Sequence, residues 1–316
     1  MSFPVFDLHC DTPLGLLGPS LRECGSLQNN DLHIDLQRAA KLPGYAQCFA
    51  CFTSPEFPSS GISAEQLFER QMIGILREIE ANKKTVRLAY TAADVRKNFS
   101  EGLASAILTI EGPAGFGYDP ALLEDLYKIG FRITTLGWNE KNVLTGSHCT
   151  DGGLTDMGRE YVQEAQRLGM IVDVSHISDS GFWDIMKITT APVIASHSNS
   201  RAVWNVSRNI TDDMFRAICQ TDGTVGINQY AGFLGEAPTM DTVSDHILHF
   251  MNIDPSGRHI SLGGDLDGCG ELPDGFTGVQ DYPNLAENLL GRGLDQETVR
   301  HIFWNNALEV MERCCM

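Results

Sequence analysis

Basic residues are scarce in this 316-residue chain, in which 23 Lys and Arg face 41 Asp and Glu for a formal net charge of −18. So large an acidic excess repels the phosphates of nucleic acids and anionic lipid surfaces, which argues against a nucleic-acid partner. The same excess is compatible with a soluble enzyme or with a protein that holds cations.

Long hydrophobic runs are also missing. No stretch approaches the ~18 consecutive apolar residues that a transmembrane helix needs. The first residues, 1–7, have neither the basic region nor the apolar core of a secretory signal. We therefore expect a cytoplasmic protein without a membrane partner.

Cysteine occurs nine times, but without the paired spacing of a zinc ribbon or finger. One C-x-x-C pair, Cys48 and Cys51, stands alone, so the sequence does not predict a four-cysteine zinc site. In a chain without a secretory signal, reduced and buried thiols are the expected state.

Short β-rich segments alternate with longer amphipathic segments along the chain. This alternation predicts a parallel sheet with helical crossovers, and eight such strands favour an α/β fold of the TIM-like (β/α)8 barrel type over an open sheet. No linker, repeat or low-complexity segment indicates a second domain, so we expect residues 1–316 to form one domain. The expected strands are 5–10, 46–53, 105–110, 132–136, 171–175, 193–196, 224–229 and 260–264.

The segments between these strands have helical periodicity, with one exception. The long piece 14–43, between the first two strands, is expected to be an elaborated loop. The expected helices are 64–79, 121–129, 156–168, 179–188, 212–220, 242–251 and 295–313.

Ionisable side chains follow five of the eight expected strands. In a barrel the C-terminal ends of the strands meet at one mouth, where active sites are built, so these residues should lie together. Three imidazoles and three carboxylates exceed what one tetrahedral zinc ion uses and suit two ions that share a carboxylate. Two ions about 3.5–4 Å apart can hold a hydroxide between them and polarise a carbonyl. The candidate ligands are His9, Asp11, Glu111, His176, His197 and Asp265.

Other polar residues have simpler interpretations. A lone Asp after a strand usually caps the next helix, and we expect Asp7 and Asp267 to cap helices or to orient ligands. The remaining histidines outside the loops of the mouth are expected on the surface or in packing: His33, His246, His249, His259 and His301.

Five segments together resemble the membrane (renal) dipeptidase family: FDLHCDT at 6–12, TIEG at 109–112, DVSHIS at 173–178, VIASHS at 193–198 and GGDLDG at 263–268. The resemblance runs in order from residue 5 to about residue 310 and is to shorter, bacterial-type members. It implies a TIM-like barrel, two zinc ions per chain, and cleavage of dipeptides with a free C-terminal carboxylate, including L-Xaa-D-Xaa peptides. Because barrels of this family commonly pair, it also implies a homodimer.

The resemblance divides the candidate ligands between the two ions. Asp265 would also take a proton from the metal-bridging hydroxide and pass it to the leaving amine, so Asp265 and Glu111 are the expected catalytic groups. The implied sets are His9, Asp11 and Asp265 for one zinc ion, His176 and His197 for the other, and Glu111 as the bridge.

Four further residues are expected to contact substrate. Arg208 matches the family's substrate-binding arginine, and its planar, permanently charged guanidinium suits a carboxylate or a developing oxyanion. Trp138 stands where many members carry a substrate-contacting His, a departure that affects rate and substrate rather than the metal site. His148 could reach the mouth from the following loop, and Tyr230 follows the seventh expected strand.

Two other functions remain compatible with the sequence. An amidohydrolase-type metal hydrolase would act on an N-acyl amino acid, a cyclic amide or a lactone. Such enzymes often have His-x-His after the first strand and a carboxylated lysine after the fourth. Here the first motif is His9-Cys10-Asp11 and Lys141 lies beyond the strand end, which favours the dipeptidase. The other hypothesis is a metal-binding or scaffold protein without activity. The absence of the His after the fourth strand leaves this hypothesis open.

Overall fold

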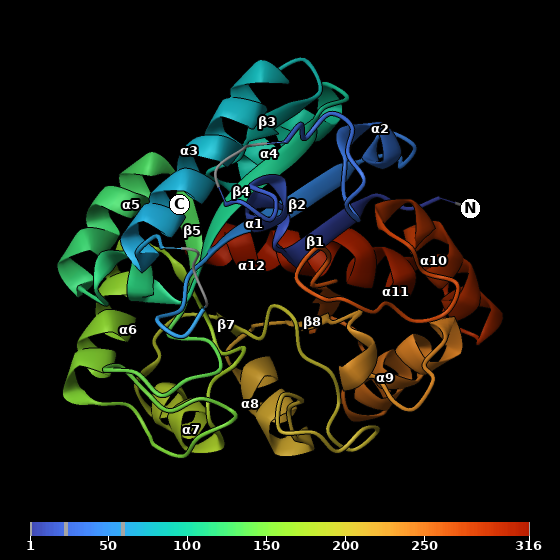
Figure 1. Cartoon of the computed structure of the whole chain (residues 1–316). Helices are drawn as coiled ribbons and strands as arrows, with labels where there is room; N and C mark the ends of the chain where they lie inside the picture. Colours follow the sequence, from blue (N-terminus) through green and yellow to red (C-terminus); the bar gives the residue numbers. More distant parts are fainter. Residues whose placement is uncertain (1, 22–24, 58–60, 316) are drawn as a thin grey trace.

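The computed structural model describes residues 2–21, 25–57 and 61–315. Within these residues the strands form one parallel sheet, and helices surround it (Figure 1). The strands are β1 Val5–Cys10, β2 Tyr45–Phe52, β3 Val86–Leu88, β4 Ala104–Glu111, β5 Phe131–Thr135, β6 Ile171–Asp173, β7 Val193–Ile194, β8 Val225–Ile227 and β9 Ile260–Leu262.

The sheet closes on itself between β7 and β8. The other neighbours follow the order β7-β6-β5-β4-β2-β1-β9-β8. A parallel bridge between Ala195 and Val225 closes the ring. Ala195 donates its N–H to the carbonyl of Thr224 at 3.1 Å and accepts from the N–H of Gly226 at 2.8 Å. The expected TIM-like (β/α)8 barrel is therefore confirmed, with β3 as an additional strand beside β4.

Helices cover the outside of the barrel and begin at polar caps. Ser63 and Thr91 form capping boxes at the starts of α3 and α4, and Thr211 caps α8. These side chains bond the free N–H groups of the first turn and fix where each helix begins. The α-helices are α1 Thr12–Leu16, α2 Leu36–Ala39, α3 Ala64–Ala81, α4 Ala92–Ser100, α5 Leu123–Ile129, α6 Asp156–Leu168, α7 Asp179–Ile188, α8 Asp212–Gln220, α9 Met240–Ile253, α10 Tyr282–Gly291, α11 Gln296–Arg300 and α12 Asn306–Cys314.

Several elements differ from the sequence expectation. The second crossover contains β3 and α4 after α3, and the chain before the closing helix contains α10. The expected helix 295–313 is divided into α11, a π-helical turn His301–Asn305 and α12. The expected loop 14–43 includes most of α1 and all of α2, while its residues 22–24 lie outside the described part of the chain. Within the described residues, no helix is both long and apolar enough to cross a membrane.

Apolar side chains from six strands form one buried cluster with side chains of α12. The ribbon of α12 lies near the centre of the view in Figure 1. Side chains from so many strands meet only on the inner face of a barrel, so α12 closes its N-terminal end. The polar residues at the C-terminal ends of the strands are therefore supported by a packed apolar core. The strand residues of this cluster include Phe6, Leu8, Cys48, Ile107, Ile133, Ile171 and Ile194.

Candidate metal centre

All six predicted ligands lie at the C-terminal mouth of the barrel, at the ends of five strands. They are buried or nearly so, although they come from segments far apart in the sequence. His9 is in β1 and Asp11 follows it, Glu111 ends β4, and His176, His197 and Asp265 follow β6, β7 and β9.

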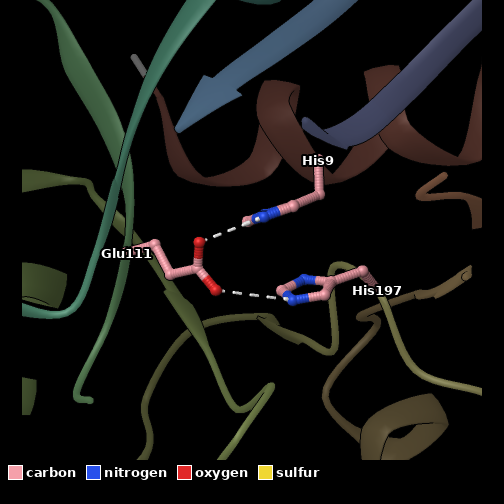
Figure 2. Close-up of side chains that lie close together, drawn as sticks. All are labelled: His9, Glu111 and His197. Atoms are coloured by element: carbon pink, nitrogen blue, oxygen red, sulfur yellow. Dashed lines mark ion pairs between the residues drawn. The ribbon is translucent and has the colours of Figure 1, made fainter. Parts of the chain in front are cut away.

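The carboxylate of Glu111 lies between the rings of His9 and His197 (Figure 2). Its Oε2 atom is 3.3 Å from Nε2 of His9, whereas its Oε1 atom is 2.9 Å from Nε2 of His176 and 3.7 Å from Nε2 of His197. The Nε2 atoms of His176 and His197 are 3.0 Å apart. One carboxylate oxygen thus faces His9 and the other faces His176 and His197. A carboxylate that is shared by two ions needs this arrangement.

The group around His9 contains buried polar atoms that need a partner. Nε2 of His9 is 3.6 Å from Oδ2 of Asp11 and 4.0 Å from Oδ1 of Asp265. Nε2 of His9 and Oδ1 of Asp11 are buried and have no hydrogen-bond partner among the described residues. Leaving such atoms unpaired is costly, and a cation would satisfy both. The imidazole and carboxylate donors fit zinc-class ions.

Burial and mutual charge shift the pKa values of this group. Burial opposes protonation of His9, but the charges of Glu111 and Asp11 raise its pKa well above the usual value. Burial and the charge of Glu111 raise the pKa of Asp11 to about 8, and burial raises the pKa of Asp265 to about 6. These carboxylates repel one another, and bound dications would keep them ionised.

Side chains behind the ligands fix the imidazole rings. Nδ1 of His197 lies 2.6 Å from Oγ of Ser196, which donates to the buried carboxylate of Asp173. Nδ1 of His176 lies 2.9 Å from Oδ1 of Asn139. Such outer contacts orient metal-binding histidines. Asn139 and Asp173 were not among the predicted site residues, although both lie at or near a strand end and Asp173 begins the DVSHIS segment.

Asp7 and Asp267, the two carboxylates near the mouth that were not predicted to be ligands, have other partners. Asp7 accepts from the backbone N–H of Gly264 at 3.0 Å and from the hydroxyl of Tyr282. Asp267 accepts from the hydroxyl of Thr12 at 2.6 Å. Both therefore connect segments that are far apart in the sequence.

A cleft of roughly 610 Å³, open to solvent, adjoins the cluster, and Trp138, Tyr230 and Phe233 contribute its aromatic lining. Trp138 packs edge-on against Phe52 with ring centroids 5.0 Å apart, and Tyr230 packs edge-on against Phe233 at 4.7 Å. The structure thus places Trp138 and Tyr230 beside the candidate ligands, in an apolar wall that a small ligand can contact.

Arg208 is buried near the cluster and has free donors. Its Nη1 donates to Oγ of Ser198 at 2.8 Å, whereas its Nε and Nη2 have no partner among the described residues. Burial lowers the pKa of Arg208, and the charges of Asp265 and Glu111 oppose that effect. A guanidinium with free, buried donors is suited to an anion in the mouth.

His148 lies beside the site although it comes from a loop. Its Nε2 is 2.8 Å from Oδ1 of Asn139, its Nδ1 is 3.0 Å from Oγ of Ser207, and its ring centroid is 6.0 Å from that of His176. Burial and the charge of Arg208 lower its pKa to about 4. His148 therefore lies near the mouth, as expected. The sequence did not indicate its contacts with Asn139 and Ser207.

Comparison with known proteins identifies the family. Residues 1–314 match the model of the membrane dipeptidase family, peptidase family M19. An uncharacterized dipeptidase of Schizosaccharomyces pombe is 34% identical over 98% of this chain and 80% of its own length.

Two solved structures have the same fold, each with a TM-score of 0.89. One is dipeptidase AC, a metallopeptidase of family M19, with 27% identity and coverage of 100% of this chain and 99% of its own. The other is a Rhodobacter sphaeroides metallopeptidase liganded with a phosphinate mimic of L-Ala-D-Ala, with 28% identity and coverage of 99% and 100%. With the matching family model and the cluster at the mouth of the barrel, these likenesses show that the chain belongs to the membrane dipeptidase family and is a metallo-dipeptidase.

Proposed function

We propose that the chain is a zinc-dependent dipeptidase that hydrolyses dipeptides with a free C-terminal carboxylate, L-Xaa-D-Xaa peptides included. One observation carries this proposal: Arg208 is buried beside the Glu111 cluster with two free donors. Those donors suit the carboxylate of a dipeptide. The relative from Rhodobacter sphaeroides, liganded with a mimic of L-Ala-D-Ala, supports the same substrate class.

The proposed metal content of the catalytic mouth is two zinc ions. Bound between these side chains, zinc would supply Lewis-acid activation of the scissile carbonyl and of the attacking water. The central position of Glu111, with one oxygen toward each group of side chains, supports its role as the shared ligand. The proposed ligands are His9, Asp11 and Asp265 at one position, His176 and His197 at the other, and Glu111 at both.

The protein's own residues would bind the substrate and move the proton. Arg208 would hold the carboxylate or the developing oxyanion, while Trp138 and Tyr230 would contact the side chains of the dipeptide. Asp265 would accept a proton from the attacking water and deliver it to the leaving amine. Asn228 supports that role, because its Nδ2 donates to Oδ2 of Asp265 at 3.0 Å and so fixes the carboxylate.

A combined metal and substrate measurement tests the proposed function. Elemental analysis of the purified protein should give at least two zinc-class ions per chain. L-Ala-D-Ala and other free dipeptides should be cleaved, and the same peptides amidated at the C-terminus should be poor substrates. Equal cleavage of acid and amide would contradict carboxylate recognition. Hydrolysis of an N-acyl amino acid or a lactone, but of no dipeptide, would favour the amidohydrolase alternative.

We further propose that the protein acts in the cytoplasm. The eight cysteines among the described residues are free, and five of these are buried, which suits a reducing compartment. Cell fractionation tests this location, and recovery in an oxidising compartment would contradict it.

We also propose a homodimer. Exposed Val143, Met157 and Trp183 lie on or near α6 and α7 and supply apolar surface for a two-fold contact. Light scattering at micromolar concentration should give the mass of two chains, and the mass of one chain would count against the dimer.

A further inference from the structure

A second group of side chains that could bind a metal ion lies at the opposite end of the barrel from the catalytic mouth. Cys219 is in the last turn of α8, Asp254 directly follows α9, and His259 directly precedes β9. Segments that lead from a helix into the next strand lie at the N-terminal end of a (β/α)8 barrel. One ligand-type atom of each residue lies within 4.8 Å of those of the other two.

The carboxylate of Asp254 has one satisfied and one unsatisfied oxygen. Its Oδ1 accepts from the backbone N–H of Ser256 at 3.1 Å and from the hydroxyl of Ser256 at 2.6 Å. Its Oδ2 is buried and has no hydrogen-bond donor among the described residues. A buried carboxylate oxygen without a donor is unfavourable, and a cation is the partner that would satisfy it.

The ring of His259 is held in the form that a metal ligand needs. Its Nδ1 lies 2.8 Å from the backbone carbonyl of Gly223. A carbonyl accepts only from a protonated nitrogen, so in the neutral ring the lone pair is on Nε2. A hydrogen bond from the second ring nitrogen to a backbone carbonyl is the usual support of a metal-binding histidine. The backbone is also fixed, because the carbonyl of His259 accepts from the N–H of Val225 at 2.9 Å.

Cys219 completes a donor set that differs from that of the catalytic cluster. Its thiol is partly buried on α8, and burial together with the charge of Asp254 raises its pKa to about 12. A bound metal would displace the thiol proton, so affinity should increase with pH. Thiolate, imidazole and carboxylate are all zinc ligands, and three of them leave a fourth position for water.

We propose that Cys219, Asp254 and His259 form a further, structural site for a zinc-class ion. The ion would join the C-terminal ends of α8 and α9 to the start of β9, and Figure 1 shows these two helices side by side on the barrel. Its role would be stability rather than catalysis, and this assignment replaces the expectation that His259 is a surface or packing residue. The proposal does not depend on the substrate of the catalytic centre.

Cobalt substitution tests this site with a readout other than activity. In protein produced in cobalt-supplemented medium, a cobalt–thiolate bond gives a near-ultraviolet charge-transfer band, which the nitrogen and oxygen ligands proposed for the catalytic centre do not give. We expect the band in the wild-type protein and its loss in Cys219→Ser, a nearly isosteric change. Cys269→Ser, which alters a thiol in the wall of the catalytic cleft, is the matched control and should keep the band.

Metal content and stability provide the second measurement. Zinc-loaded Cys219→Ser and Asp254→Asn should each contain about one ion fewer per chain than the wild type, melt at a lower temperature and keep dipeptidase activity. A wild-type protein without the cobalt band would overturn the proposal. So would a band that survives in Cys219→Ser or disappears in Cys269→Ser. None of these outcomes bears on the substrate of the catalytic centre.

Discussion

The side-chain oxygen of Asn139 lies 2.9 Å from Nδ1 of His176, the ring whose Nε2 faces Glu111. The same oxygen lies 2.8 Å from Nε2 of His148. If it accepts from both rings, the lone pair of His176 is on Nε2, on the side of Glu111. One amide oxygen therefore orients a candidate metal ligand and the loop histidine together.

Replacement of this oxygen should weaken metal binding. We expect Asn139→Leu to lower affinity at the position of His176 and His197 by about 10–100-fold, the usual effect of losing such an outer contact. Competition with a chelator measures the change. Asn139→Asp keeps an acceptor and should restore most of the affinity, whereas Asn284→Leu, on the surface of α10, is the control. Wild-type affinity in Asn139→Leu would contradict the orienting role.

Arg208 should determine recognition of the substrate carboxylate. Arg208→Lys keeps the charge but loses the planar fork of donors, so turnover of free dipeptides should fall by about 10–100-fold. The preference for the free acid over the amide should shrink, while the metal content should not change. Arg216→Lys, at an exposed position on α8, is the control. Unchanged kinetics in Arg208→Lys would exclude this role.

Close backbone contact at the closure of the barrel makes Gly263 irreplaceable. A Cβ atom there would lie 1.7 Å from the carbonyl oxygen of Ser196, the residue before His197. Backbone cannot yield as a flexible side chain does, so Gly263→Ala should lower the free energy of unfolding by about 3 kcal/mol or more. Gly291→Ala at the end of α10 meets no atom within 4 Å and should raise it by about 0.5–1 kcal/mol. Urea unfolding compares the two, and equal stabilities would refute the argument.

The barrel and its mouth could be predicted because their signals are local. Most strands read as short apolar runs, and ligand-type residues such as His9, Glu111 and Asp265 come at their ends. The geometry of a parallel barrel then brings those ends together without further information. In contrast, β3 has three residues, of which Arg87 is exposed, so it gives no apolar run that would predict a strand.

Contacts made by side chains across loops could not be predicted. The approach of Asn139 to His148 depends on the path of the loop between them, which no periodicity in the sequence encodes. The group of Cys219, Asp254 and His259 comes from two separate helix-to-strand connections and matches no compact spacing motif. Such sites become visible only when the distances between side chains are known.

Asp265 belongs to the cluster of candidate ligands and also lines the cleft, so it is the residue to test for proton transfer. Asp265 follows β9, which pairs with β1, and its Oδ1 lies 4.0 Å from Nε2 of His9. Its backbone has a left-handed φ of 55°, a conformation that Asn adopts readily, so Asp265→Asn should fold.

Asn matches Asp in size but cannot carry the proton from the attacking water to the leaving amine. We therefore expect Asp265→Asn to bind dipeptide yet lose about 10²–10⁴-fold in turnover, the usual contribution of general acid–base catalysis. Because loss of metal would imitate this result, metal must be counted in the same sample. Asp267→Asn alters a nearby carboxylate that bonds Thr12 instead, and its turnover should change far less. Near-normal turnover in metal-replete Asp265→Asn would show that another group moves the proton.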